Sequence, residues 1–228
     1  MATISELNFK FLREIKNNNN RNWFAQNKSV YQQHQDLLVS FAEKMMVRLN
    51  EHDKIEYRSG KKTVIRVYRD IRFSKDKSPY KTYSGMGFRR STQLLRGGYY
   101  IHLEPSKSFV GGGFWEPSKE DLLKIRKGIE SDESEFRKIV SSQEFVSVFG
   151  KLKGKQLKTC PKGFSKDSTA IDLLRFKQYI LTKEFSDDDV ISYDFFDRAH
   201  EVFKSMRPFL DFMSYLLTTD ENGVPLYE

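Results

Sequence analysis

Apolar residues recur at helical spacing at both ends of the chain. At the start, leucines, isoleucines and phenylalanines fall every three or four positions, which predicts an amphipathic helix over residues 1–16. Asparagines at 17–20 form a polar break, and a second apolar stripe predicts a helix from about 22 to 50. A similar stripe after the aspartates at 187–189 predicts one last helix, kinked at Pro208 because proline removes an amide donor.

The pattern changes to a period of two in the middle of the chain. Apolar and charged residues alternate over 64–73, which predicts a strand, while 99–103 and 108–115 predict an antiparallel hairpin. Ser118 is placed to cap a helix together with Asp121, and 171–185 predicts a short helix followed by a strand. We therefore expect one α+β domain, residues 1–228, with a central antiparallel or mixed sheet flanked by N-terminal and C-terminal helices. Two smaller domains are the alternative.

Residues 58–96 carry the excess positive charge of the chain. Twelve lysines and arginines fall there against two acids, Asp70 and Asp76, so the segment has a formal charge of +10 in a chain of +8. Concentrated positive charge is typical of a protein with an anionic partner. The remainder sums to −2, which argues against a generally basic nucleic-acid binder.

The remaining composition limits the class and setting of the protein. The 228 residues are 38% hydrophobic and 14% aromatic, enough for a well-buried core. A single cysteine, Cys160, excludes an internal disulfide framework and favours a reducing, cytoplasmic setting. We expect no membrane span, because no run of about eighteen apolar residues occurs, and no export signal, because the start is amphipathic.

The predicted strand at 64–73 supplies the main candidate site. Alternation places Arg66, Asp70 and Arg72 on one face, where the carboxylate can orient a guanidinium while other donors stay free for phosphate or carboxylate. Arg69 falls on the apolar face and must find a carboxylate, a ligand or a bulge. A structural ion-pair network is the alternative interpretation, but two acids leave most of the twelve bases without a local partner.

Two further segments extend this site. The turn at 74–82 places Lys77 and Tyr80 at the end of the predicted strand. His102 shares a strand face with Glu104, which could hold one tautomer for proton transfer, although a structural hydrogen bond would explain the same pair. The predicted ligand-binding residues are Arg66, Arg69, Asp70, Arg72, Lys77, Tyr80 and His102.

Other polar and glycine positions are less informative. His34, His52 and His200 are expected to lie far apart, so no histidine metal site is predicted. The glycines at 111–113 interrupt a predicted strand, which indicates either a phosphate against exposed amides, or a bulge or a large aromatic side chain from a neighbouring strand.

The ordered landmarks of the sequence resemble one family over nearly the full chain. The run from Arg66 through Tyr80 is similar to the signature of the family called domain of unknown function 2461. The opening at 11–31, with its asparagines, Trp23 and Phe24, and the later segments at 99–103, 111–115, 157–164 and 173–177 resemble further landmarks of that family. The resemblance implies an α+β domain found mostly in bacteria, with no established activity.

Three functions remain open from the sequence. The first is the binding of a phosphorylated small molecule or nucleotide at the arginine-rich strand and turn. The second is a nucleic-acid-binding domain, because aromatic residues alternate with the basic ones, and the third is a structural or protein-interaction domain without catalysis. The sequence identifies no catalytic set and no cofactor, and it leaves enzymatic activity and oligomeric state open.

Overall fold

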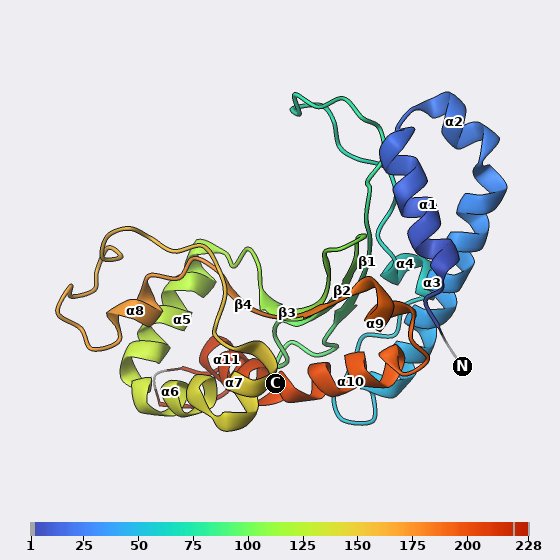
Figure 1. Ribbon diagram of the computed structural model, residues 1–228. Helices are drawn as coiled ribbons and strands as arrows, with labels where there is room; N and C mark the ends of the chain where they lie inside the picture. Colours follow the sequence, from blue (N-terminus) through green and yellow to red (C-terminus); the bar gives the residue numbers. More distant parts are fainter. Residues whose placement is uncertain (1–2, 221, 228) are drawn as a thin grey trace. The chain divides into compact units, whose positions relative to one another are not determined.

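The computed structural model describes residues 3–220 and 222–227, and Figure 1 follows them from the blue N-terminal helices to the red C-terminal ones. Within this range the chain forms helices and one antiparallel sheet with the strand order β1-β2-β3-β4. The strands are β1 (Ser84–Arg89), β2 (Gly98–Leu103), β3 (Ser108–Phe114) and β4 (Tyr179–Phe185). The predicted α+β class, with helices before and after an antiparallel sheet, is confirmed.

Contacts within the chain divide it into two compact units, each made of three separate segments. Unit 1 takes the described residues of Met1–Phe88, Tyr100–Val110 and Glu184–Glu201. Unit 2 takes those of Arg89–Tyr99, Gly111–Lys183 and Val202–Glu228. That residues 1–228 form a single domain stays a prediction.

Unit 1 is built around the packing of its first helices. Its helices are α1 (Glu6–Asn17), α2 (Arg21–Gln26), α3 (Lys28–Leu49), α4 (Gly60–Thr63) and α9 (Asp187–Ile191), and α10 (Phe195–Ser205) begins in it. The apolar stripe of α1 is buried against α3, with the Phe11 ring 4.6 Å from that of His34. The single helix expected over 22–50 is divided at Asn27, whose side-chain amide donates to the Trp23 carbonyl at 2.9 Å.

Unit 2 has its own aromatic core. Its helices are α5 (Lys119–Ser131), α6 (Glu133–Ser141), α7 (Gln143–Phe149), α8 (Ile171–Leu174) and α11 (Arg207–Thr218). The Phe136 ring stacks 5.3 Å from that of Phe212, so α6 packs on α11. Ser118 caps α5 as predicted, accepting from the Asp121 amide at 3.0 Å, but the Asp121 carboxylate binds Arg96 at 2.6 Å instead of reaching back.

Two expectations from the sequence are wrong in detail. The last helix is divided into α10 and α11, and Pro208 lies in the first turn of α11, where a missing amide donor costs no intrahelical bond. The segment 64–73 is no regular strand, because it pairs only through the isolated bridges Val64↔Met86 and Tyr68↔Tyr80. The first strand of the sheet is instead β1.

Two of the glycines at 111–113, Gly112 and Gly113, serve packing in unit 2. A Cβ on Gly113, which has φ +117°, would lie 2.3 Å from the Tyr179 carbonyl oxygen. A Cβ on Gly112 would lie 2.6 Å from the Met206 sulfur. Gly112 and Gly113 therefore allow the close approach of neighbouring backbone and of a methionine side chain, whereas the sequence had suggested a bulge or a large aromatic ring as the structural reason.

No helix in the described part of the chain combines the length and the apolar character that crossing a bilayer requires.

Candidate functional site

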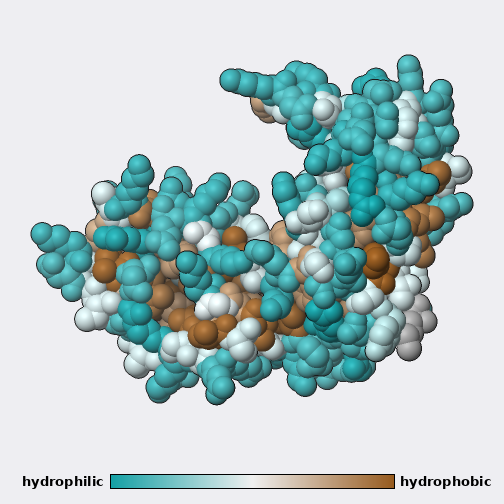
Figure 2. All heavy atoms as spheres, in the orientation of Figure 1, coloured by the Kyte–Doolittle hydropathy of each residue, from teal (hydrophilic) through white to brown (hydrophobic). Residues whose placement is uncertain are grey.

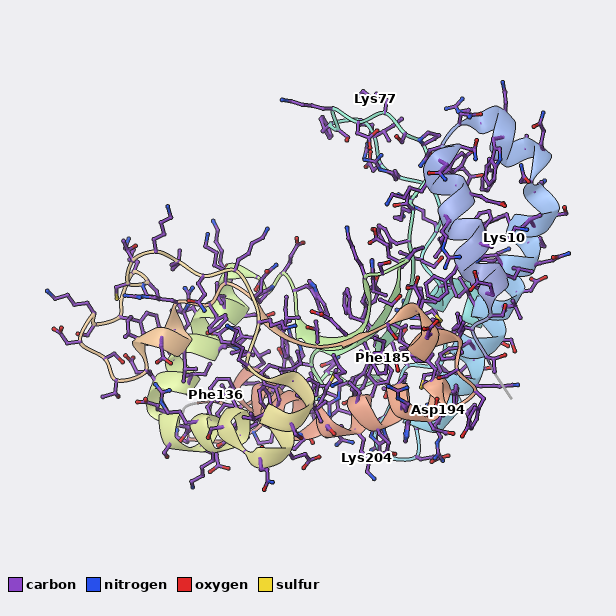
Figure 3. All side chains as sticks on the ribbon, in the orientation of Figure 1. Lys10, Lys77, Phe136, Phe185, Asp194 and Lys204 are labelled. Carbon is purple, nitrogen blue, oxygen red and sulfur yellow. The ribbon has the colours of Figure 1, made fainter. Side chains whose placement is uncertain are left out.

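The arginine-rich segment forms an arm of unit 1 between α4 and β1, here defined as residues 65–82. The Arg69 amide donates to the Pro79 carbonyl at 2.9 Å, and the Lys81 amide donates to the Val67 carbonyl at 2.7 Å. Figure 3 shows Lys77 at the far end of the arm. The arm is therefore a narrow antiparallel loop whose two sides are joined near its base.

Asp76 organises the turn of the arm. Its carboxylate accepts from the Ser78 hydroxyl at 2.5 Å, the Ser78 amide at 2.9 Å and the Arg69 guanidinium at 2.5 Å. These bonds, with the Ser78 hydroxyl as the largest cause, lower the pKa of Asp76 to about 2. Arg69, which the sequence left in need of a partner, thus finds this carboxylate and also donates to the Ser78 carbonyl at 3.1 Å.

Asp70 orients one guanidinium, as the sequence predicted. Its two oxygens accept from Arg72 Nε at 3.0 Å and Arg72 Nη2 at 2.7 Å, and this bidentate bond lowers the pKa of Asp70. Both side chains are exposed. The Arg66 side chain, by contrast, has no hydrogen bond or ion pair with any described residue.

The base of the arm is fixed to the helices of unit 1. The Asn19 side chain donates to the Tyr80 carbonyl at 2.9 Å and accepts from the Tyr80 amide at 3.0 Å. The Tyr80 ring stacks on Phe24 with centroids 4.2 Å apart, so Phe24 packs α2 against the arm. Lys81 Nζ donates to the carbonyls of Arg66 at 2.6 Å and Tyr68 at 2.8 Å, which holds the two sides of the arm together.

A concave pocket of about 590 Å³ opens at this base. It is lined by side chains from the end of α1, the loop after it and the arm: Lys16, Asn19, Arg69, Asp70, Asp76, Ser78, Tyr80, Lys81, Thr82 and Tyr83. Three of them are cations and two are carboxylates, and each carboxylate is bonded to an arginine. The pocket therefore offers ammonium, guanidinium and hydroxyl donors around a net positive charge.

Burial shifts the pKa of two groups that line this pocket. It raises the pKa of Tyr80, with a further contribution from Tyr68, so the Tyr80 phenol keeps its proton at neutral pH and can donate. It lowers the pKa of Lys81, and the charge of Arg66 lowers that pKa further. An anion bound near Lys81 would relieve the repulsion between the Lys81 ammonium and the Arg66 guanidinium.

His102 lies behind one wall of the pocket. Its ring is 4.7 Å from that of Tyr83, which lines the pocket, and is stacked on Phe109 at 4.9 Å. Its Nε2 is 3.2 Å from Glu104 Oε2 and its Nδ1 is 3.4 Å from the Tyr100 hydroxyl. Burial lowers the pKa of His102, and Glu104 partly offsets this. His102 is thus held between partners, and it contacts the Tyr83 ring that lines the pocket without lining the pocket itself.

The structure brings together only part of the predicted ligand-binding set. Arg69, Asp70 and Tyr80 line the pocket, whereas Arg66, Arg72, Lys77 and His102 do not. Lys77 Nζ donates to the Ile71 carbonyl at 3.0 Å, at the other end of the arm. A ligand role for each of the seven residues stays a prediction.

Sequence reasoning did not select the remaining lining residues. Lys16 and Asn19 lie far from the arm in sequence, and nothing in the pattern marks them as neighbours of Tyr80. The sequence features that could have pointed to lining residues were the polar break at 17–20, which contains Asn19, and the hydroxyl of Thr82 in the turn.

The structural ion-pair alternative accounts for some of the twelve basic residues at 58–96. Five pair with carboxylates, namely Arg58, Arg69, Arg72, Arg90 and Arg96, while Lys77 and Lys81 bond backbone carbonyls. Arg90 is buried in unit 2, where it bonds Asp211 and Ser214. The other five, Lys61, Lys62, Arg66, Lys75 and Arg89, have no such bond among the described residues.

The described residues contain no group of three metal-ligating side chains. His52 and His200, expected to be far apart, have rings 4.9 Å apart in unit 1, so that expectation was wrong. His34 is a buried structural residue, bonded to Asn8 and Ser84.

The profile of a family described as "Conserved hypothetical protein (DUF2461)" matches residues 8–212. The chain belongs to this family. The match runs from within α1 to within α11 and includes the arm and every residue that lines the pocket, so the resemblance read from the sequence is confirmed. No curated protein and no solved structure matches the chain significantly. The description of the family names no activity.

Proposed function

We propose that this DUF2461 protein binds a phosphorylated small molecule or a nucleotide in the pocket at the base of the arm. The observation that carries the proposal is the convergence of Lys16, Arg69 and Lys81 on one pocket from the end of α1 and the two sides of the arm. Phosphate oxygens are strong acceptors for ammonium and guanidinium donors, and charge-assisted bonds of this kind are about twice as strong as neutral ones.

Two of the lining lysines still have ammonium protons that can bond a ligand. Lys81 uses two of its three ammonium protons on backbone carbonyls, and the Lys16 side chain has no hydrogen bond with any described residue. Tyr83 and Tyr80 add aromatic surface and hydroxyl groups, which suit the ring and ribose of a nucleotide. A pocket of about 590 Å³ is also of the size that small-molecule sites have.

A thermal-shift screen tests the proposal with inorganic phosphate, nucleotides, sugar phosphates and short single-stranded oligonucleotides at two salt concentrations. A ligand that binds only the native state raises the midpoint of unfolding by mass action. We expect a salt-resistant shift from at least one small phosphate compound. No shift from any small phosphate compound, or a shift only from oligonucleotides that is lost at high salt, would contradict the proposal.

A matched pair of lysines on α1 locates the binding. Lys16→Gln removes a lining cation, and we expect it to weaken binding of the active compound about three- to tenfold. Lys10→Gln makes the same change on an exposed lysine of the same helix that does not line the pocket (Figure 3), and we expect unchanged affinity. Equal losses in both variants would indicate diffuse electrostatics and not a pocket.

A further inference from the structure

The arm exposes an aromatic side chain that the fold does not use. Phe73 is 95% exposed, more than Tyr57 at 83% or Tyr193 at 78%, and no large apolar side chain among the described residues is more exposed. Its only aromatic or cation–π contact among the described residues is with the Arg72 guanidinium, 5.9 Å from the ring centroid. Because exposing an aromatic ring forgoes the stabilisation that burial would give, folding does not explain this residue.

Positive charge follows the arm toward that ring. Residues 65–82 contain six cations and two acids, a formal charge of +4, and Figure 2 shows this projecting segment as almost wholly hydrophilic. The side chains of Arg66 and Lys75 have no hydrogen bond or ion pair among the described residues, and the Lys77 side chain bonds only a carbonyl, which leaves its charge uncompensated. The arm therefore combines free cations with an unpartnered planar ring.

We propose that the arm binds single-stranded nucleic acid, with Phe73 stacking on a base and Arg66, Lys75 and Lys77 contacting phosphates. Cations along a backbone path together with aromatic platforms are the two elements that sequence-tolerant single-strand binding uses. This binding is independent of the small-ligand pocket, because none of these four residues lines it.

A membrane surface is a poorer match for the same features. Interfacial binding relies on a continuous apolar face that enters the boundary between headgroups and acyl chains. Phe73 is flanked in sequence by Arg72 and Ser74, and one ring supplies little apolar area. A planar base stacks on a single ring, so nucleic acid fits the arm better.

Fluorescence anisotropy of a labelled, mixed-sequence single-stranded oligonucleotide tests the proposal on the full chain at about 50 mM and about 200 mM salt. We expect Phe73→Ala to weaken binding about five- to hundredfold, the range that loss of one stacked base gives. Phe73→Trp should keep affinity, whereas Phe73→Leu should lose it, because leucine is apolar but cannot stack. Tyr193→Ala, at another highly exposed aromatic, should bind like wild type.

The phosphate contacts have a separate readout. Arg66→Gln should reduce the slope of log affinity against log salt by about 0.7, the contribution of one contact to a single strand. Absence of oligonucleotide binding at low salt, equal affinity of Phe73→Ala and wild type, or full affinity of Phe73→Leu would each overturn the proposal. So would Phe73-dependent binding to vesicles of anionic phospholipid without binding to the oligonucleotide. None of these results would count against the proposed ligand pocket, because binding there is tested separately, with small phosphate compounds and the Lys16→Gln variant.

Discussion

Acidification from about pH 6.5 to pH 4 should destabilise the protein through one buried histidine of unit 1, His34 on α3. Its Nδ1 is 3.0 Å from the side-chain nitrogen of Asn8 on α1, and its Nε2 is 2.9 Å from the Ser84 hydroxyl of β1. The Asn8 oxygen is already engaged, since it accepts from the Ser5 amide at 3.0 Å. This network assigns a neutral imidazole that accepts at Nδ1 and donates at Nε2.

Protonation of His34 would place two donors against each other. The imidazolium Nδ1 proton would face the Asn8 amide protons, and turning the amide over would break its bond to Ser5. Burial of the ring, which is 2% exposed, also penalises the charge and lowers the pKa of His34 from its ordinary value of 6.5 to about 4. The folded protein therefore resists taking up a proton that the unfolded chain accepts.

The magnitude follows from this shift in pKa. One pKa unit corresponds to about 1.4 kcal/mol, so His34 should lower the free energy of unfolding by about 3 kcal/mol below pH 4. The sign is fixed because the unfolded chain binds the proton first as the pH falls. Stability is thus complete above about pH 6.5 and declines until about pH 4, where the folded protein also binds the proton.

Urea unfolding of wild type and His34→Gln at several pH values would measure this effect. The pKa of His102 is also lowered, so the difference between the two proteins isolates His34 from the general acid response. We expect the cost of His34→Gln to be largest near neutral pH and to shrink by about 3 kcal/mol toward pH 4. A constant difference across this range, or an NMR titration of His34 with a midpoint above pH 6, would refute the reasoning.

Three further predictions concern the fold. Asn19→Ala removes both side-chain bonds to Tyr80 and should lower the free energy of unfolding by about 1–3 kcal/mol in urea; an unchanged midpoint would show that these bonds do not anchor the arm. Gly113→Ala should cost more than about 2 kcal/mol because its Cβ would collide with the Tyr179 carbonyl, whereas Gly87→Ala, with open space at its Cβ, should stay within about 0.5 kcal/mol. Thermal unfolding should show one cooperative transition, because neither unit is a continuous segment of chain; two separate calorimetric transitions would instead favour two domains.

The elements that the sequence predicted well were those whose pattern matched their burial. In β2, Tyr99, Ile101 and Leu103 are buried and their neighbours are half-buried, so alternation identified the strand. In the arm the same alternation separates half-buried residues from exposed ones, and no residue over 65–73 is buried. The periodic pattern was therefore real, but it marked a projecting arm and not a strand of the sheet.

The strand β1 was missed for the opposite reason. Its sequence, with Gly85 and Gly87, has little intrinsic preference for a strand. Gly85 is needed there because the Tyr100 hydroxyl would lie 2.2 Å from a Cβ at that position. Only the buried Met86 and Phe88 carried the alternation, and a requirement set by a neighbouring strand cannot be read from the local pattern.

The candidate site, too, could be predicted from the sequence only in part. The excess of basic residues and the alternation along the predicted strand led to Arg69 and Asp70 and to the bond between Asp70 and Arg72. The turn that follows this segment led to Tyr80. Local pattern could not add Lys16 to this group, because it joins the pocket through the packing of α1 beside the base of the arm.

Localisation of a bound phosphate compound tests the central claim most directly. Backbone amide NMR of the isotopically labelled chain, titrated with the most effective compound of the thermal-shift screen, would report which amides respond. We expect saturable shifts concentrated at Asn19, Tyr80, Lys81 and Tyr83, which line the pocket. Shifts confined to residues 71–75 of the arm, none of which lines the pocket, or spread evenly over the basic residues, would contradict a phosphate pocket at the base of the arm.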